Sequence, residues 1–184
     1  MIVIKIFVFF VATLGLVYLS RASLRAPRSH GFYRFFAWEA ILVLILLNID
    51  AWFQDPLSWH QLISWCFLSV SLFLVLHGVQ MLRQIGKPDR QRDDASLVGF
   101  ERTTALVTKG VYRYIRHPLY SSLLFLAWGV FFKLPSWTGG LLTVLSTLLL
   151  VATARVEEAE DIRFFGPAYD VYRRQTKMFV PFVF

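Results

Sequence analysis

Two short clusters of charged and aromatic residues have the chemistry to bind a charged ligand. In the first, Tyr-x-x-x-Arg-His-Pro-x-Tyr, Arg116 and His117 stand immediately before Pro118 and a charge-free run. Pro118 favours the first turn of a helix, where its missing N–H costs no hydrogen bond. The residue before a proline is biased towards an extended conformation, so the His117 ring is presented at a helix N-terminus. Free N–H groups gather there and favour an anion such as a carboxylate.

Aromatic residues surround this cluster. Tyr112, Tyr114 and Tyr120 offer flat faces on which a base or a cation can stack. An interfacial belt of aromatic residues and arginines, common in membrane proteins, has the same composition. Composition alone leaves both interpretations open.

The second cluster, Arg-Val-Glu-Glu-Ala-Glu-Asp, directly follows another apolar run. At helical spacing Glu157 and Asp161 share one face, and Glu158 points about 100° away. A carboxylate close to a membrane surface usually forms an ion pair or takes part in function. The alternative is a solvated helix end with Glu–Arg pairs, for example between Glu160 and Arg163.

The third cluster, Phe-Phe-Gly-Pro-Ala-Tyr-Asp-Val-Tyr, spans residues 164–172. Gly166 followed by Pro167 predicts the end of one helix and the start of another. The second helix is short and amphipathic, with Tyr169 and Tyr172 three residues apart. This pattern is typical of an interfacial helix that covers a neighbouring site.

The composition places these clusters in a membrane protein. The 184 residues fit one domain, and 57% are hydrophobic against 17% charged. Soluble proteins average about 45–50% apolar and about 25% charged residues, so a soluble globular enzyme is excluded. The single cysteine, Cys66, lies inside an apolar run and allows neither an intrachain disulfide nor a cysteine-based metal cluster. We predict no metal site.

Five apolar runs predict an all-α fold with five membrane-spanning helices, since roughly 20 helical residues cross a bilayer core of about 30 Å. The expected spans are residues 2–20, 35–53, 57–82, 115–132 and 134–154. The fourth run is short, so we expect its helix to tilt or to begin within residues 112–116. The first run is expected to be a retained span and not a cleaved signal peptide, because no A-x-A-like site precedes the basic stretch after it.

The basic residues predict the orientation of these spans. Of 19 Lys and Arg, all but Lys5 and Lys133 lie in alternate connections and the C-terminal tail. The positive-inside rule then places the N-terminus outside and the C-terminus in the cytoplasm. The formal charge of +7 is thereby explained without a nucleic-acid partner. The small size favours a prokaryotic plasma membrane.

The fourth and fifth spans are separated by a turn, Lys133–Trp137, too short for anything but an antiparallel hairpin. The hairpin brings the start of the fourth span, with Arg116 and His117, beside the end of the fifth, with Glu157 and Glu158. The sequence therefore predicts that the first two clusters meet at the cytoplasmic end of the hairpin.

Taken in order, the clusters resemble the isoprenylcysteine carboxyl methyltransferase family and the related phospholipid N-methyltransferases. The shared pattern is Gly-x-Tyr-x-x-x-Arg-His-Pro-x-Tyr, a hydrophobic hairpin, Glu-Glu, then Phe-Gly-x-x-Tyr-x-x-Tyr and a late proline. The resemblance covers roughly residues 103–184, and the first three spans match only in number. The short chain is similar to the small prokaryotic members. It departs from the pattern at Asp161, where a leucine is expected.

The resemblance implies one integral-membrane methyltransferase domain over residues 1–184, with the cofactor-binding half in residues 103–184. The implied methyl donor is S-adenosylmethionine (SAM). Carried over by position, the cofactor-binding residues are Gly110, Tyr112, Arg116, His117, Pro118, Tyr120, Glu157 and Glu158. The implied acceptor is lipophilic or delivered by the membrane: an isoprenylcysteine carboxylate, a phospholipid amine or a small thiol.

The chemistry of these residues agrees with that implication. Glu157 or Glu158 can bind the ammonium group of SAM through a charge-assisted hydrogen bond. Arg116, His117 and the start of the fourth span suit its carboxylate, and a tyrosine can stack on adenine. Methyl transfer needs the nucleophile about 3–3.5 Å from the methyl carbon. The residues identify no catalytic base, so we expect positioning to be the main device.

Two other functions compete with this interpretation. A sterol-type membrane reductase that binds NADPH has a similar Arg-His-Pro layout, and Arg113, Arg173 and Arg174 would suit a 2′-phosphate. Such proteins are typically about twice as long. A non-enzymatic membrane module is the other alternative, and the intact Arg-His-Pro and Glu-Glu clusters argue against it.

Other polar residues have simpler interpretations. We expect His77 to form an interhelical hydrogen bond and Glu39 to pair with an arginine. The segment 83–102 has no assigned role, and its mixed charges at 87–94 predict a solvated loop. Three residues are expected on the outer side, remote from the clusters: Asp50, Asp55 and His60.

Overall fold

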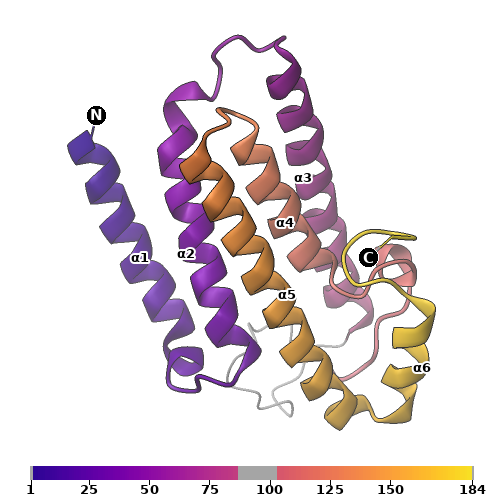
Figure 1. The fold of residues 1–184 in the computed structure, drawn as a ribbon. Coiled ribbons are helices and arrows are strands. Elements are labelled where there is room, and N and C mark those ends of the chain that lie inside the picture. Colours follow the sequence, from indigo (N-terminus) through magenta and orange to yellow (C-terminus); the bar gives the residue numbers. More distant parts are fainter. Residues whose placement is uncertain (1, 87–102, 184) are drawn as a thin grey trace.

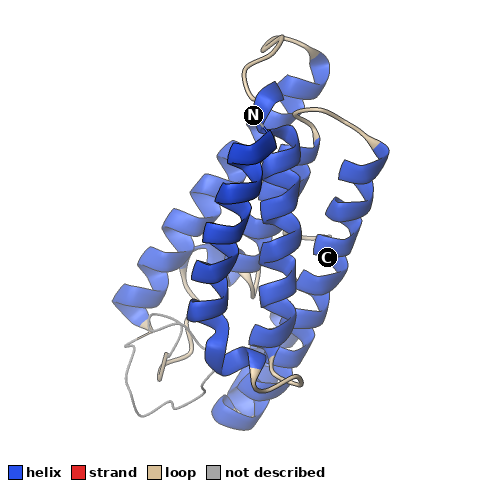
Figure 2. Cartoon of the chain, turned by 90° about the vertical axis from the view of Figure 1, so that its left-hand side faces the viewer, coloured by secondary structure: helices blue, strands red, loops and turns tan. Residues whose placement is uncertain are grey.

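The computed structural model describes residues 2–86 and 103–183, in which helices are joined by short connections (Figures 1 and 2). The α-helices are α1 (Ile2–Leu24), α2 (His30–Asn48), α3 (Trp59–Ile85), α4 (Pro118–Phe131), α5 (Trp137–Phe165) and α6 (Pro167–Gln175). Two 3-10 helices add single turns, η1 (Ile49–Ala51) and η3 (Gly110–Arg113). The described residues contain no β-sheet, and the predicted all-α class is confirmed. The predicted loop at 87–94 lies outside the described residues.

Four of the helices are long and apolar enough to cross a membrane: α1, α2 extended by η1, α3 and α5. The protein therefore has the helices of an integral membrane protein. The fourth predicted span, α4, is apolar but has only 14 residues. At 1.5 Å per residue it is about 21 Å long, shorter than the bilayer core.

The expectation that this helix begins within residues 112–116 is wrong. Those residues form the end of η3 and an isolated bridge between Ile115 and Lys177, and α4 begins at Pro118. The backbone N–H groups of Arg116 and His117 donate to the carbonyl oxygens of Lys177 and Met178, at 2.8 and 3.2 Å. The C-terminal segment thus holds the chain extended just before the proline.

Two helices extend beyond the predicted spans into charged sequence. α2 begins at His30, ahead of the expected residue 35, and α5 continues to Phe165, well past residue 154. Charged residues in both extensions are buried between helices, with Arg34 4% and Glu158 6% exposed. Because these charges have partners inside the protein, they do not end the helices.

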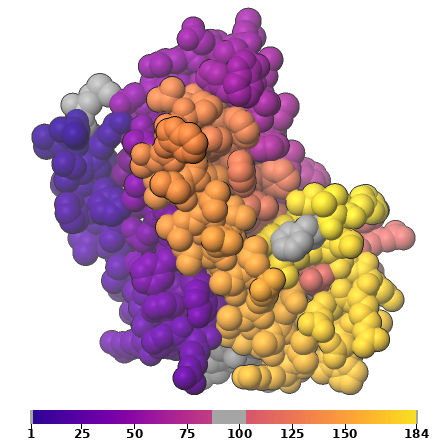
Figure 3. Space-filling model, viewed as in Figure 1, coloured from indigo at the N-terminus to yellow at the C-terminus, as the bar shows by residue number. Residues whose placement is uncertain are grey.

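Successive long helices run antiparallel, as Figure 1 shows. α2 packs most extensively against α5 and also contacts α1 and α4, while α3 packs against α4. Ala37 of α2 and Ala154 of α5 are fully buried, and such small residues let helices approach closely. α1 lies at the edge of the molecule against α2 (Figure 3), with most of its apolar side chains exposed.

The α4–α5 hairpin has a tight turn with a defined cap. The Ser136 hydroxyl accepts a hydrogen bond from the backbone N–H of Gly139 at 3.1 Å, which satisfies one of the free donors at the start of α5. The two helices run antiparallel and contact each other, as the short connection predicts. Their other ends carry the clusters considered below.

Two polar residues, Glu39 of α2 and Asp50 of η1, form contacts with α1 that the sequence did not predict. Glu39 accepts a hydrogen bond from the Thr13 hydroxyl of α1 at 2.9 Å, where an arginine partner was expected. Asp50 forms an ion pair with Lys5 at 2.6 Å and so ties the start of α1 to the end of α2.

Candidate functional site

The segment before α4 is shaped by a glycine and a proline. Gly110 begins η3 with a φ of +61°, and a Cβ atom there would lie 2.8 Å from Nε2 of His77. Only glycine fits both the backbone conformation and the space. Pro118 occupies the first turn of α4, and His117 immediately before it has φ −120° and ψ 61°. This backbone aims the Arg116 and His117 side chains at α5.

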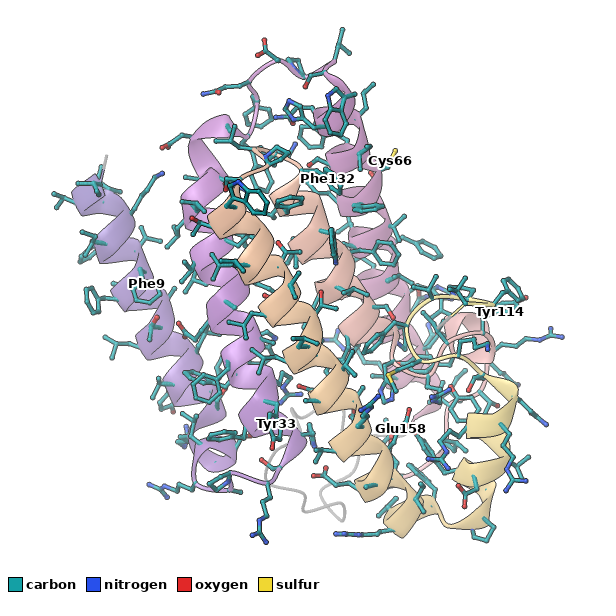
Figure 4. All side chains as sticks on the ribbon, in the orientation of Figure 1. Phe9, Tyr33, Cys66, Tyr114, Phe132 and Glu158 are labelled. Atoms are coloured by element: carbon teal, nitrogen blue, oxygen red, sulfur yellow. The ribbon has the colours of Figure 1, made fainter. Side chains whose placement is uncertain are left out.

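Charged groups from α5 meet this segment in a compact network. Arg116 donates from Nε to Oε1 of Glu158 at 2.8 Å and from Nη1 to the carbonyl oxygen of Thr176 at 2.5 Å. His117 lies between two carboxylates, with Nδ1 3.3 Å from Oε2 of Glu157 and Nε2 3.3 Å from Oε1 of Glu158. Figure 4 shows Glu158 on the side of α5 that faces α6. The predicted meeting of the two clusters is therefore observed.

His117 is buried and positively charged in this network. Burial disfavours its charged form, but hydrogen bonds and the charges of Glu157 and Glu158 outweigh burial and raise the pKa of His117 to about 9. Both ring nitrogens then carry protons, and each can donate to one carboxylate. The ring also stacks on Tyr120, with centroids 5.5 Å apart.

Tyrosines form the aromatic side of the site. Tyr169 and Tyr172 of α6 are both buried, and the Tyr172 hydroxyl donates to the carbonyl oxygen of Tyr112 at 2.7 Å. Burial is the main cause that raises the pKa of both α6 tyrosines above the usual range. They stay protonated at neutral pH. The short helix α6 covers the site, as the third cluster predicts.

These side chains enclose a cavity of about 80 Å³. Its polar lining comes mainly from Arg116, His117, Glu157 and Asp161. Its aromatic and apolar lining is Tyr112, Tyr120, Phe165, Tyr169, Tyr172, Leu82, Leu106, Val107 and Leu119. Pockets that enclose a whole small molecule usually have about 300–1,000 Å³. A nucleoside-sized ligand would therefore require these side chains to separate.

The structure distributes the eight predicted cofactor-binding residues over four positions. Five line the cavity: Tyr112, Arg116, His117, Tyr120 and Glu157. Glu158 lies beside it and pairs with Arg116 and His117. Pro118 is buried at the start of α4, and Gly110 faces His77 on the other side of η3.

His77 belongs to a separate apolar groove. Its ring stacks on Phe73 with centroids 5.6 Å apart and an interplanar angle of 7°. The groove runs between α3, η3 and the C-terminal segment, and Gly110, Tyr114 and Phe179 also line it. His77 does not line the charged cavity.

Two residues that sequence reasoning did not assign to the site are His30 and Arg34 at the start of α2. His30 is fully buried and contacts Oε2 of Glu160 through Nδ1 at 2.5 Å. Arg34 is buried, with its guanidinium 4.9 Å from the centre of the Trp38 ring. The sequence signal that could have identified them is a histidine and an arginine one helical turn apart at the start of an apolar run.

Comparisons with known proteins agree with this geometry. The family model described as phospholipid methyltransferase matches residues 64–167, which include the Arg-His-Pro segment and both glutamates. The chain is 27% identical over 129 residues to a methanethiol S-methyltransferase of Crocosphaera subtropica, covering 66% of this chain and 44% of that protein. It is 26% identical over 153 residues to a methanethiol S-methyltransferase of a Pseudomonas species, covering 80% and 54%.

A shorter match involves a protein-S-isoprenylcysteine O-methyltransferase of Schizosaccharomyces pombe, 35% identical over 80 residues, or 42% of this chain and 34% of that protein. The chain spans about half or less of the length of these curated relatives. No solved structure matches. Because the family model covers more than half of the chain and contains the central charged network, the chain belongs to the phospholipid methyltransferase family.

Proposed function

We propose that this protein is an integral-membrane methyltransferase that uses SAM as methyl donor and acts on a lipophilic or membrane-delivered acceptor. One observation carries the proposal. Arg116 and His117, just before α4, form ion pairs with Glu158 and Glu157 of α5 beside one cavity. All four residues lie within the segment that matches the family. Groups of both signs and aromatic faces thus occur together.

The residues around the cavity fit the functional groups of SAM. Glu157 lines the cavity and suits an ammonium group, while Arg116 and His117 suit a carboxylate. Tyr112 and Tyr169 offer faces for a purine. In the present arrangement the cations and carboxylates pair with one another and the cavity is small. A zwitterionic ligand would exchange these internal pairs for pairs with its own two charges.

Positioning is the main contribution of the protein to the reaction. When bound, SAM would supply a methyl group carried on a sulfonium: the acceptor's lone pair forms a bond to the methyl carbon, and the sulfur keeps the electron pair of the broken bond. Arg116, His117 and Glu157 would hold the ends of the donor, and α6 with its tyrosines would exclude water. His117 is protonated at neutral pH and the α6 tyrosines keep their protons, so none of them is a base. This favours acceptors that are already ionised when they bind, such as a carboxylate or a thiolate.

The relatives support a small or lipid-linked acceptor. Their names specify methanethiol and protein-linked isoprenylcysteine, and the family is named for phospholipids. For this chain we propose an acceptor that reaches the site from the membrane. The distribution of basic residues supports a site that faces the cytoplasm. For the membrane itself we propose a prokaryotic plasma membrane.

Calorimetry on the detergent-purified protein tests the proposal. SAM is titrated into the wild type and into Glu157→Gln, which keeps the shape of the side chain and removes its charge. We expect the substitution to weaken SAM binding by roughly 10- to 100-fold, as for loss of a hydrogen bond to a charged group. Asp50→Asn removes a carboxylate that pairs with Lys5 and serves as the matched control.

The outcomes separate the competing functions. Binding of SAM that depends on Glu157 and not on Asp50 supports the methyltransferase. NADPH is titrated in the same way. If NADPH binds and SAM does not, the protein is a reductase of the sterol type. If neither binds, the proposal is wrong and a non-enzymatic role takes its place.

A further inference from the structure

We infer that α2, which lies outside the segment that matches the family, completes the proposed SAM site by holding Glu157 in place through Arg34 and His30. The inference rests on the proposed function for its ligand. It assigns Arg34 and His30 as positioning residues, because His30 contacts Glu160 of α5, Arg34 is buried one helical turn further along α2, and neither residue lines the charged cavity.

The first step is the contact between α2 and α5 at this end of the bundle. The Glu160 carboxylate contacts His30 twice. One oxygen lies 2.5 Å from Nδ1 of the ring, and the other accepts a hydrogen bond from the backbone N–H at 3.4 Å. The backbone group is one of the N–H donors left free at the start of a helix. One carboxylate therefore fastens the first turn of α2 to α5.

The second step is the spacing along α5. Glu157 and Glu160 are three residues apart, so they lie one above the other on neighbouring turns. Fastening Glu160 therefore fixes the rotation of the face that carries Glu157. The extensive packing of α2 on α5 continues this contact along both helices.

The third step is electrostatic. Glu157 contacts His117 at the start of α4 at 3.3 Å, and the buried Arg34 and His30 of α2 also favour its charged form. Arg34 is 4% exposed and its guanidinium lies over the Trp38 ring, which limits its movement. A buried carboxylate needs nearby cations to remain charged. If a ligand draws His117 towards its own carboxylate, the buried Arg34 guanidinium of α2 remains to hold Glu157 ionised and facing the cavity.

Two measurements test this inference on the full chain in detergent. The first is SAM affinity. Arg34→Gln should weaken binding roughly tenfold, and Arg34→Lys, which keeps the charge, should restore most of the loss. Arg25→Gln removes an exposed arginine from the α1–α2 connection and is the matched control, expected to bind as the wild type does. Unchanged SAM affinity in Arg34→Gln would overturn the inference.

The second measurement needs no ligand. A double-mutant cycle in the apparent Tm compares Arg34→Gln, Glu157→Gln and the combined variant. The combined loss should be smaller than the sum of the single losses, because removing both partners leaves no unpaired buried charge. Additive losses would overturn the inference. If the wild type fails to bind SAM, the proposed function fails, and this cycle still decides whether α2 holds Glu157.

A further variant guards against misfolding of Arg34→Gln. Glu160→Gln keeps the size of the side chain and removes the charge that fastens His30. It should also weaken SAM binding, although Glu160 does not line the cavity. Wild-type affinity in Glu160→Gln together with a normal Tm would contradict the α2 contribution.

Discussion

The imidazole of His117 is the centre of the charged network. Its two ring nitrogens contact both carboxylates of the Glu-Glu pair. The sequence predicted that His117 would stand at a helix start because Pro118 follows it, and that local prediction is accurate. The contact between α2 and α5 near Glu157 was not predictable, because its residues, His30 and Glu160, are 130 residues apart in the chain.

The charge of His117 predicts how stability depends on pH. Its pKa is about 9 in the folded protein against an ordinary value of 6.5, so the folded state binds the proton more tightly than the unfolded chain. The resulting stabilisation, of order 3 kcal/mol, is complete below pH 6.5 and is lost as the pH rises through 9. We expect the apparent Tm, followed by tryptophan fluorescence, to fall over this interval.

A matched pair of variants assigns the effect. His117→Gln should have a lower Tm at pH 6 and a flatter profile between pH 6.5 and 9. His60 contacts the carbonyl oxygen of Phe132 at the other end of the bundle, and His60→Gln should keep the wild-type slope. An unchanged slope in His117→Gln would refute the assignment.

The elements around the site show where local sequence rules succeed and where they stop. Pro118 and the Gly166–Pro167 pair mark helix boundaries that the structure reproduces. The end of α5 was misplaced because Arg155 and the acids after it look like the water-exposed end of a span. Their partners come from α2, the α4 start and α6, and such tertiary contacts override a hydropathy boundary.

The connection that carries Tyr112 depends on a tight contact at Gly110. A Cβ atom at this position would be strained by the positive φ and would also lie 2.8 Å from His77 and 3.0 Å from Met81. Gly110→Ala should therefore destabilise the protein by about 1–3 kcal/mol and weaken SAM binding, because η3 must move. Thermal unfolding and calorimetry on the same preparation measure both effects.

Gly166 provides the control for this element. It has a similar φ of +63°, but a Cβ atom there would have nothing within 4 Å. Gly166→Ala, at φ 63° and ψ −142°, therefore includes backbone strain without any clash. Adding His77→Ala to Gly110→Ala should recover part of the loss. No recovery on adding His77→Ala would show that the contact with His77 is unimportant.

Buried charged and polar side chains form separate clusters at the two ends of the helix bundle. At the end away from the site, the fully buried Lys133 donates to Oε1 of Gln61 at 2.9 Å, and its ammonium lies 3.2 Å from the centre of the Trp65 ring. The sequence identified Lys133 only as an isolated charge on the outer side. Its aromatic surroundings come from the α2–α3 connection and α3, which no local pattern places beside the α4–α5 turn.

This division predicts a definite orientation in the membrane. Among the described residues, the end with the site carries nearly all the basic residues of the connections, whereas Lys133 is enclosed by protein and Lys5 is paired with Asp50. The positive-inside rule therefore places the α1–α2 connection in the cytoplasm and the α2–α3 connection outside.

Single cysteines in a Cys66→Ser background test this orientation, since Cys66 is the only native cysteine. Gln54→Cys should react with a membrane-impermeant maleimide in intact cells, and Arg28→Cys only after permeabilisation. The reverse pattern would turn the site to the outside, where intracellular SAM could not reach it, so the orientation and the proposed donor stand or fall together.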